Sequence, residues 1–432
     1  MLAFWGILII VVFMYLILSK RLSAFAALII VPVLVGWLAG FGPQLGSMMM
    51  NGVKTTAPTA ILMMMAVLFF GILVDAGLFD PVVRKIILMV GGDPLKVIMG
   101  TALLAIVASL EGEGAVTVII TCTPFLPLYR RMHLSVTTLA VIVWMTVVVK
   151  GFFPWASPSA RTVTALGIES SALFSAVALC LLVGVIWILI TAYYLGLKAR
   201  ASVGRLTIDP ALLNEIVASL DTGDNDHKRP KLLVFNLILL IIVMVAIFRE
   251  WVPTAIIFEL GAAVALVLNY HSLQEQSDRL FSHARSILTV GIMIMAAGVF
   301  IGILSGTKMI DAIALLLISL IPPVMGPHMG LITAILSGPL SFALSPDGFF
   351  FGVLPILAKL ANAYGISNVQ IGAAGLMGMA FQIIGPTIGA MWLLLGVCEI
   401  NLGDFHRAAI IPFTGMTILF IITELIVGGF CF

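Results

Sequence analysis

Long apolar segments separated by short polar tips occupy almost the whole chain. Several reach the roughly 20 residues that a helix needs to cross the hydrocarbon of a bilayer. Three further stretches, 44–56, 78–94 and 308–323, predict helices that lie along the membrane interface. The apolar segments are approximately 2–19, 22–40, 57–76, 95–110, 115–128, 134–149, 171–197, 232–249, 253–270, 286–305, 328–344, 349–360, 368–384 and 405–430.

Two pairs of these segments are short and joined by a polar, glycine-containing tip. The first tip is 111–114, with the sequence Glu-Gly-Glu-Gly, and the second is 345–348, with the sequence Ser-Pro-Asp-Gly. Carboxylates that faced lipid at such tips would be costly. Both pairs therefore predict re-entrant hairpins packed inside protein.

The two halves of the chain repeat one another. The segment Phe69 to Leu73 recurs as Phe300 to Leu304, 231 residues later (300 − 69), and Asp80 falls on Asp311 at the same offset. Internal duplication in a very apolar chain is typical of a secondary transporter with its site at the junction of two repeats.

Basic residues predict the orientation. Clusters near residues 20, 84, 130, 198–231 and 279–285 are expected in the cytoplasm. Each half then has five crossings and one hairpin, and an odd number of crossings inverts the second copy. The predicted organisation is an all-α membrane protein with a first inverted repeat at 1–198, a cytoplasmic linker at 199–231 and a second inverted repeat at 232–432.

Composition agrees with this class. The 432 residues are 62% hydrophobic and 10% charged, whereas soluble domains carry about 25% charged residues. The formal net charge of +2 argues against a nucleic-acid partner. The four cysteines and six histidines show no ligand spacing, so no metal site and no cofactor is expected. We expect a multi-pass protein of the cell inner membrane.

Each hairpin is followed by a segment that is broken at a proline. The breaks contain Pro154 in the first half and Pro386 in the second. Proline and glycine interrupt a helix and leave free N–H groups on one side and free C=O groups on the other. Two hairpin tips that meet two broken helices would build a polar site near the midplane, suited to an anion and to a cation or proton.

Lys150 and Arg161 are the candidate partners of a substrate anion. Arg161 offers a planar fork that matches a carboxylate, and Lys150 is a compact charge that can replace a mobile cation. The alternative is that both lie at the outer interface. Further candidate substrate ligands are Ser157, Ser159, Thr387 and Gln382, although the hydroxyls are equally suited to capping local turns.

Glu111, Glu113 and Asp347 are the candidates for proton or cation coupling, because carboxyls removed from water exchange protons near neutral pH. The alternative is a static ion pair with Lys150 or Arg161. The remaining residues assigned to the hairpin tips are Gly112, Gly114, Ser345 and Gly348.

At these residues the chain resembles the citrate–divalent-metal/proton symporter family, within the broader superfamily of inverted-repeat carboxylate carriers. The resemblance runs nearly end to end, and its strongest parts are 71–81, 92–96, 296–300, 302–309 and 352–357. It implies uptake of citrate, often as a metal complex, together with protons. It also implies a homodimer with scaffold and transport regions.

Carried over by position, the family's acidic hairpin falls on 111–114, its Pro-Trp on Pro154-Trp155 and its arginine on Arg161. The chain departs from the family at the expected site. Glu111 and Glu113 stand where the family usually has Asp, Lys150 where it has Asn, and Ala156-Ser157 where it has Gly-Gly. Lys150 therefore bears on whether a metal, and citrate itself, is carried.

The prediction is a proton-coupled secondary transporter, not an enzyme, for citrate or a related di- or tricarboxylate. The partners expected are this anion, protons, a carried Mg²⁺ or other divalent ion, the bilayer and a second copy of the chain. The alternative is a cation/proton antiporter of the same superfamily, which needs buried acids but no anion-binding arginine. Two further alternatives are an intramembrane enzyme and a membrane subunit that is served by a separate substrate-binding protein.

Overall fold

The computed structural model describes residues 1–19, 21–90, 92–111, 114–204, 227–249, 251–320, 322–344, 346–385 and 388–427. Gly112, Glu113, Ser345 and Thr387 lie outside these ranges, as does the side chain of Glu111. Most of the predicted linker lies outside them as well. Within the ranges the regular structure is helical and contains no strand, so the predicted all-α class is confirmed.

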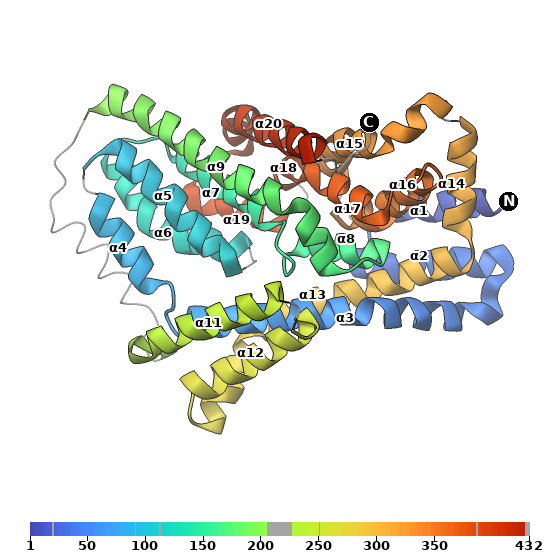
Figure 1. The fold of residues 1–432 in the computed structure, drawn as a ribbon, viewed down its shortest axis with the longest axis horizontal. Helices are drawn as coiled ribbons and strands as arrows, with labels where there is room; N and C mark the ends of the chain where they lie inside the picture. The colour runs from blue at the N-terminus through green and yellow to red at the C-terminus, as the bar shows by residue number, and fades with distance from the viewer. Residues whose placement is uncertain are drawn as a thin grey trace.

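The described residues of the first half form nine α-helices, which Figure 1 colours from blue to green. Two short elements lie among these helices. They are a π-helical turn, η1 (Trp37–Phe41), and a 3₁₀ turn, η2 (Ser109–Glu111). The helices are α1 (Leu2–Leu18), α2 (Ala24–Gly36), α3 (Gly42–Asp75), α4 (Asp80–Val90), α5 (Pro94–Ala108), α6 (Gly114–Arg131), α7 (Val136–Lys150), α8 (Ser157–Leu166) and α9 (Ser170–Val203).

The described part of the second half is helical as well. Its short turns are η4 (Pro230–Leu232), η5 (Pro323–His328) and the π-helical η6 (Gly348–Val353). Its helices are α11 (Leu233–Phe248), α12 (Thr254–Asn269), α13 (Leu273–Gly306), α14 (Met309–Leu320), α15 (Met329–Ala343), α16 (Leu354–Asn362), α17 (Asn368–Met377), α18 (Met379–Ile383), α19 (Gly389–Cys398) and α20 (Leu402–Val427).

Five of the described helices are long and apolar enough to cross a membrane, or six if one bent pair counts as a single span. They lie at Ala24–Asp75, Ser170–Val203, Pro230–Ile247, Leu273–Gly306 and Leu402–Val427. Shorter apolar helices accompany them, among them α1, α5, α7 and α12.

Helices α3 and α13 pack against each other and lie side by side in the lower part of Figure 1. Each has 34 residues, about 51 Å at 1.5 Å per residue, and they begin 231 positions apart (273 − 42). A Cβ on Gly52 would stand 2.0 Å from the Gly298 carbonyl oxygen, whereas a Cβ on Gly71 would stand 2.6 Å from the His283 ring. Early residues of one helix thus meet late residues of the other, and the two helices run antiparallel.

This continuous α3 differs from the sequence prediction of an interface helix at 44–56 followed by a separate span. Pro58 stands inside α3 without ending it. Thr56 lies in the same close crossing, since a Cβ on Gly298 would stand 2.4 Å from the Thr56 hydroxyl oxygen. Packing against α13, which the local polar pattern does not encode, therefore accounts for the unbroken helix.

The apolar core falls into two parts. A slab made of α1–α3 and α11–α13 contains two smaller clusters, one around Phe69 and Phe258 and one around Phe13 and Phe300. A bundle made of α5–α9 and α15–α20 shares one large cluster around Trp144. In Figure 1 the bundle lies above the α3 and α13 pair. Helix α8 lies between slab and bundle, because Ala160 packs with Ala60, Met63 and Ile294 while Val163 and Leu166 join the bundle core.

Candidate functional site

The first broken helix is the segment between α7 and α8. Helix α7 ends at Lys150 and α8 begins at Ser157, with Pro158 in its first turn. The Ser159 hydroxyl donates a 2.7 Å hydrogen bond to the Gly151 carbonyl, one of the groups that the break leaves without a helical partner. Ser159 thus makes the local backbone contact that was the alternative to a role in substrate binding.

Arg161 meets the second hairpin. Its Nε donates a 2.8 Å hydrogen bond to Oδ1 of Asp347, and its Nη1 donates to the Ser157 hydroxyl one turn earlier on α8. The side chains of Arg161 and Asp347 are 22% and 12% exposed. A desolvated charge of this kind needs its partner. Two predicted site residues from opposite halves therefore form one ion pair, the static arrangement that the sequence left open for Asp347.

A small cavity of about 80 Å³ adjoins this ion pair. Ser157, Arg161 and Asp347 supply its polar wall. The opposite wall comes from α3 and α13, through Met63 and Ile294 among others. The cavity therefore lies where slab and bundle meet.

Lys150 lies inside the protein rather than at the outer interface. It is 6% exposed, and its Nζ is 3.7 Å from the position that a Cβ on Gly114 would occupy. The same position is 3.6 Å from Ala390 at the start of α19. The Lys150 ammonium is thus at the tip of the first hairpin, close to where the second broken helix resumes.

Trp155 ties the first break to the first hairpin. Its Nε1 donates a 3.0 Å hydrogen bond to the Leu110 carbonyl, and its ring stacks on Phe153 at 4.8 Å between centroids. The sequence analysis named Trp155 only as part of a family motif. A tryptophan beside a helix break was the available signal, since a buried indole N–H needs an acceptor and a break supplies free carbonyls.

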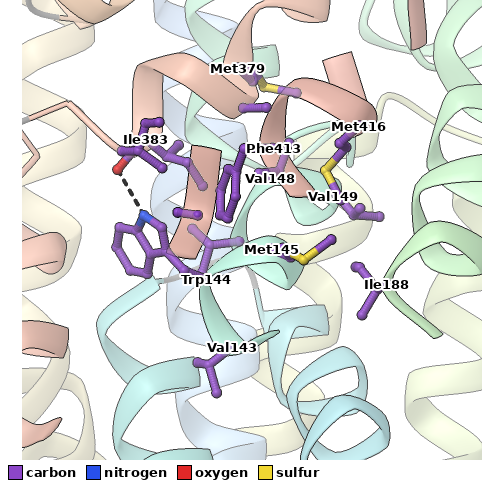
Figure 2. Close-up of a cluster of buried hydrophobic side chains, with 14 of the residues drawn as sticks. Val143, Trp144, Met145, Val148, Val149, Ile188, Met379, Ile383, Phe413 and Met416 are labelled. Carbon is purple, nitrogen blue, oxygen red and sulfur yellow. Dashed lines mark hydrogen bonds between the residues drawn. The ribbon is translucent and has the colours of Figure 1, made fainter. Parts of the chain in front are cut away.

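The second broken helix lies between α18 and α19, and two side-chain donors cover its freed carbonyls. Trp144 Nε1 donates to the Ile383 carbonyl at 2.8 Å, and His406 Nε2 is 2.7 Å from the Ile384 carbonyl. Figure 2 shows the first of these bonds inside the core of the bundle, where Trp144 lies beside Val148, Met379 and Phe413. The sequence analysis missed both residues, because neither donor lies near its acceptor in the chain.

Gln382 precedes this break and is 2% exposed. In the described part of the chain its Nε2 has no hydrogen-bond partner. Leaving a buried amide donor unpaired costs about 1–3 kcal/mol, so a ligand that accepts from it recovers that energy. Gly114 begins α6 and Gly348 begins η6, as expected for hairpin tips.

The structure therefore forms two local groups, one of Lys150 with Gly114 and Ala390, and one of Arg161 with Ser157 and Asp347. Each hairpin approaches a broken helix of the other half: Gly114 lies near Ala390, and Asp347 pairs with Arg161. No group of three or more metal-ligating His, Cys, Asp or Glu side chains occurs in the part of the chain that the structure describes.

Comparison with known proteins decides the family. The model of the citrate transporter family matches residues 13–381. The chain belongs to that family. Like the family, its relatives are transporters rather than enzymes. The chain is a multi-pass membrane protein.

Three Bacillus subtilis (strain 168) relatives cover nearly the full length. The "Citrate transporter" is 43% identical over 428 residues, with 99% of each chain covered. The "Mg(2+)/citrate complex secondary transporter" is 38% identical and covers 95% of this chain and 94% of its own. The "Uncharacterized transporter YraO" is 37% identical over 95% of both. None of these names supports the cation/proton antiporter alternative.

The solved Alcanivorax borkumensis YdaH transporter, described as having an unusual topology, resembles this chain in fold alone. The TM-score is 0.58 with 13% sequence identity over 88% of each chain.

Proposed function

We propose that this protein is a proton-coupled secondary transporter in the cell inner membrane that carries citrate, or a related di- or tricarboxylate, as a complex with a divalent metal. The full-length similarity to a citrate transporter and to a Mg(2+)/citrate complex transporter supports the substrate class. The Arg161–Asp347 ion pair is the observation that carries the assignment of the site.

The proposed architecture is two inverted repeats, 1–198 and 232–432, joined by a cytoplasmic linker at 199–231. The antiparallel crossing of α3 and α13 supports it. Gly52 and Gly71 lie 231 positions before His283 and Gly302, and the contact of Gly71 with His283 thus corresponds to the contact of Gly302 with Gly52. Equivalent helices that cross antiparallel are related by a two-fold axis perpendicular to them, which is the symmetry of an inverted repeat. We further propose a homodimer.

Arg161 is the proposed anchor of a substrate carboxylate, since its planar guanidinium already holds a carboxylate, that of Asp347, in a partly desolvated place. Ser157 orients Arg161 through the hydroxyl that accepts from Nη1. Lys150 and the unpaired amide of Gln382 supply further donors to the anion, and Thr387 supplies a hydroxyl.

Charge balance gives Asp347 its role in coupling. A substrate carboxylate that takes Arg161 leaves Asp347 without its counter-charge in a place where water is scarce. Two carboxylates on one guanidinium repel, so Asp347 binds a proton as the substrate binds. The proton leaves when the substrate leaves and Arg161 returns to Asp347. Glu111 and Glu113 are the proposed coupling groups of the other hairpin.

Uptake by the purified full-length protein in proteoliposomes tests this proposal. Labelled citrate should accumulate when the outside is acidic, and added Mg²⁺ should increase the uptake. A protein that takes up no carboxylate from a panel, yet dissipates a pH gradient when a cation is added, would instead be an antiporter and would refute the proposal.

A further inference from the structure

Helices α6 and α19 come from opposite halves of the chain and lie side by side, running in parallel. Where both helices begin, a Cβ on Gly114 would stand 3.6 Å from the Cβ of Ala390. Eight residues further along each helix (122 − 114 and 398 − 390), Cys122 Sγ lies 3.9 Å from Cys398 Sγ. Both pairs are 276 positions apart (390 − 114 and 398 − 122), so the two helices keep one register over about two turns.

The two thiols form a buried contact that the spacing of the cysteines in the sequence does not show. Cys122 is 0% exposed and Cys398 is 2% exposed, and both belong to the core of the bundle. Cys180, another cysteine that the structure describes, instead lies 3.2 Å from Oε1 of Glu424. A disulfide bond is about 2.05 Å long, so the Sγ atoms of Cys122 and Cys398 need to approach by about 2 Å to form one.

The thiol pair lies just beneath the cytoplasmic surface in the predicted orientation. Cys398 is the last residue of α19, and the side chain of the next residue, Glu399, is 72% exposed. Glu399 pairs with Arg130 in the last turn of α6, and the charge bias places Arg130 in the cytoplasm. The cytoplasm keeps thiols reduced, and disulfides that form there are usually transient and redox-sensing. The two thiols are therefore the resting form, and an oxidant from the cytoplasm reaches Cys398 first.

We propose that Cys122 and Cys398 are a redox-modification site, at which a peroxide forms a disulfide that slows transport. The effect on transport rests on the function proposed above, whereas the formation of the disulfide does not.

The reaction has two steps and consumes one hydrogen peroxide. The Cys398 sulfur attacks one peroxide oxygen, so that an S–O bond forms and the O–O bond breaks; the second oxygen leaves as hydroxide and takes the thiol proton to become water. The Cys122 sulfur then attacks the resulting sulfenic sulfur, so that the S–S bond forms and the S–O bond breaks. The leaving hydroxide takes the Cys122 proton, and the sum is two thiols and one peroxide giving one disulfide and two waters.

The disulfide affects the proposed site because the same two helices carry part of it. The core around the thiols is close-packed, so the sulfurs cannot approach without a shift of α6 and α19 relative to each other. The other ends of these helices, Gly114 and Ala390, lie about 12 Å away along each axis and adjoin the Lys150 ammonium. A shift there changes the position of the first hairpin tip beside a proposed donor to the substrate.

Peroxide treatment of the full-length protein in proteoliposomes tests the proposal. The remaining free thiols are then alkylated, and mass spectrometry of the digested protein should find a peptide pair joined through Cys122 and Cys398. Uptake of labelled citrate should fall at least about tenfold, since displacements of about 1 Å near a site have effects of this size. Dithiothreitol should remove the cross-link and restore the uptake.

Cys122→Ala and Cys398→Ala separate the disulfide from other oxidative damage. Each variant should take up citrate within about twofold of the wild type and should keep that uptake after peroxide. Alanine is chosen because serine would bury a hydroxyl in the apolar core. Cys180→Ala is the matched control, since it also removes a buried thiol but leaves the pair intact, and it should remain as sensitive to peroxide as the wild type.

Peroxide-treated protein in which Cys122 and Cys398 are both still alkylated as free thiols would overturn the modification site. A Cys122–Cys398 disulfide with unchanged uptake would overturn its effect on transport, as would equal inhibition of Cys398→Ala and the wild type. A wild-type protein that transported no carboxylate would overturn the transport function instead, and the cross-link would still decide whether the thiols react.

Discussion

The Nε of Arg161 lies 2.8 Å from Oδ1 of Asp347, although 186 positions separate the two residues in the chain. Arg161 belongs to the helix that follows the first break, and Asp347 belongs to the tip of the second hairpin. The pair joins the two halves beside the cavity of about 80 Å³. Arg161 thus already holds a carboxylate, that of Asp347, at the place proposed above for a substrate carboxylate.

Replacing Arg161 with alanine should abolish citrate uptake. The substrate loses its main counter-charge, and Asp347 loses its partner; truncation of a desolvated charge pair costs about 2–5 kcal/mol. We expect uptake of labelled citrate to fall at least about 100-fold. Arg161→Lys keeps the charge without the planar fork and should retain a small fraction of the rate.

The matched control is Arg130→Ala. Arg130 also pairs with a carboxylate, that of Glu399 at 2.8 Å, but the two side chains are 49% and 72% exposed. Exposed ion pairs of this kind contribute little to stability. Citrate uptake by Arg130→Ala should therefore stay within about twofold of the wild type. Equal uptake by Arg161→Ala and Arg130→Ala, at equal amounts in the membrane, would contradict the role of Arg161.

Asp347→Asn should separate binding from coupling. The amide no longer competes for Arg161 as a charge and cannot release a proton, so the variant should still exchange labelled for unlabelled citrate. Its accumulation of citrate driven by a pH gradient should fall about tenfold or more. Parallel counterflow and gradient-driven assays in proteoliposomes measure the two activities.

Asp311→Asn is the control for Asp347→Asn. Asp311 pairs with Lys359 at 2.9 Å, and the two side chains are 36% and 51% exposed. Because an exposed ion pair contributes little to stability, the substitution should leave both transport activities unchanged. If Asp347→Asn accumulated citrate as steeply as the wild type, the coupling carboxylate would have to be sought at Glu111 or Glu113.

The hydrogen bond from Trp144 to the Ile383 carbonyl predicts a different kind of defect. Trp144→Phe leaves that carbonyl without its donor in a buried place and should lower the free energy of unfolding by about 1–3 kcal/mol. Because Ile383 ends the helix before the second break, citrate uptake should fall as well. Thermal unfolding in detergent and the uptake assay measure the two effects.

Trp187→Phe removes a comparable bond, from Nε1 to the Pro412 carbonyl at 2.9 Å, between α9 and α20. It should cost similar stability and leave uptake nearly intact, because Pro412 lies inside the continuous helix α20 and the bond covers no carbonyl that a break has freed. An equal loss of uptake in the two variants would show that stability alone, rather than the geometry of the break, explains the defect.

The sequence predicted much of the fold because two signals in it are strong. The long apolar segments predicted the helical class. The match of Phe69 to Leu73 with Phe300 to Leu304 predicted two helices of equal length, which are α3 and α13. Their full extent was missed. Residues 44–56 look polar in isolation, and only the crossing with α13, between residues more than 200 positions apart, explains why they continue the helix.

The candidate site residues were chosen one by one from their chemistry, and the sequence did not predict how they are arranged. Arg161 and Asp347 were both nominated from their chemistry, yet a single sequence cannot show that they pair with each other. The sequence allowed Lys150 to lie either at the substrate site or at the outer interface of the membrane. Its 6% exposure favours a position inside the protein. The donors that cover the freed carbonyls of the second break, Trp144 and His406, were not recognised because any carbonyl near a break is an equally good acceptor until the packing is known.

The crossing of α3 and α13 gives the last prediction. A Cβ on Gly52 would stand 2.0 Å from the Gly298 oxygen and 2.7 Å from the Gly302 Cα, so Gly52→Ala must push two backbones apart. Backbone atoms yield less readily than the end of a side chain, and we expect a loss of about 3 kcal/mol or more in the free energy of unfolding.

A Cβ on Gly46 of the same helix meets nothing within 4 Å, so Gly46→Ala should instead stabilise the protein by about 0.5–1 kcal/mol. Gly71→Ala, near the other end of α3, meets the movable ring of His283, so it should cost less than Gly52→Ala. Thermal unfolding of the three variants in one detergent ranks them, and a Gly52→Ala protein as stable as Gly46→Ala would show that the two helices do not meet as closely as the structure has them.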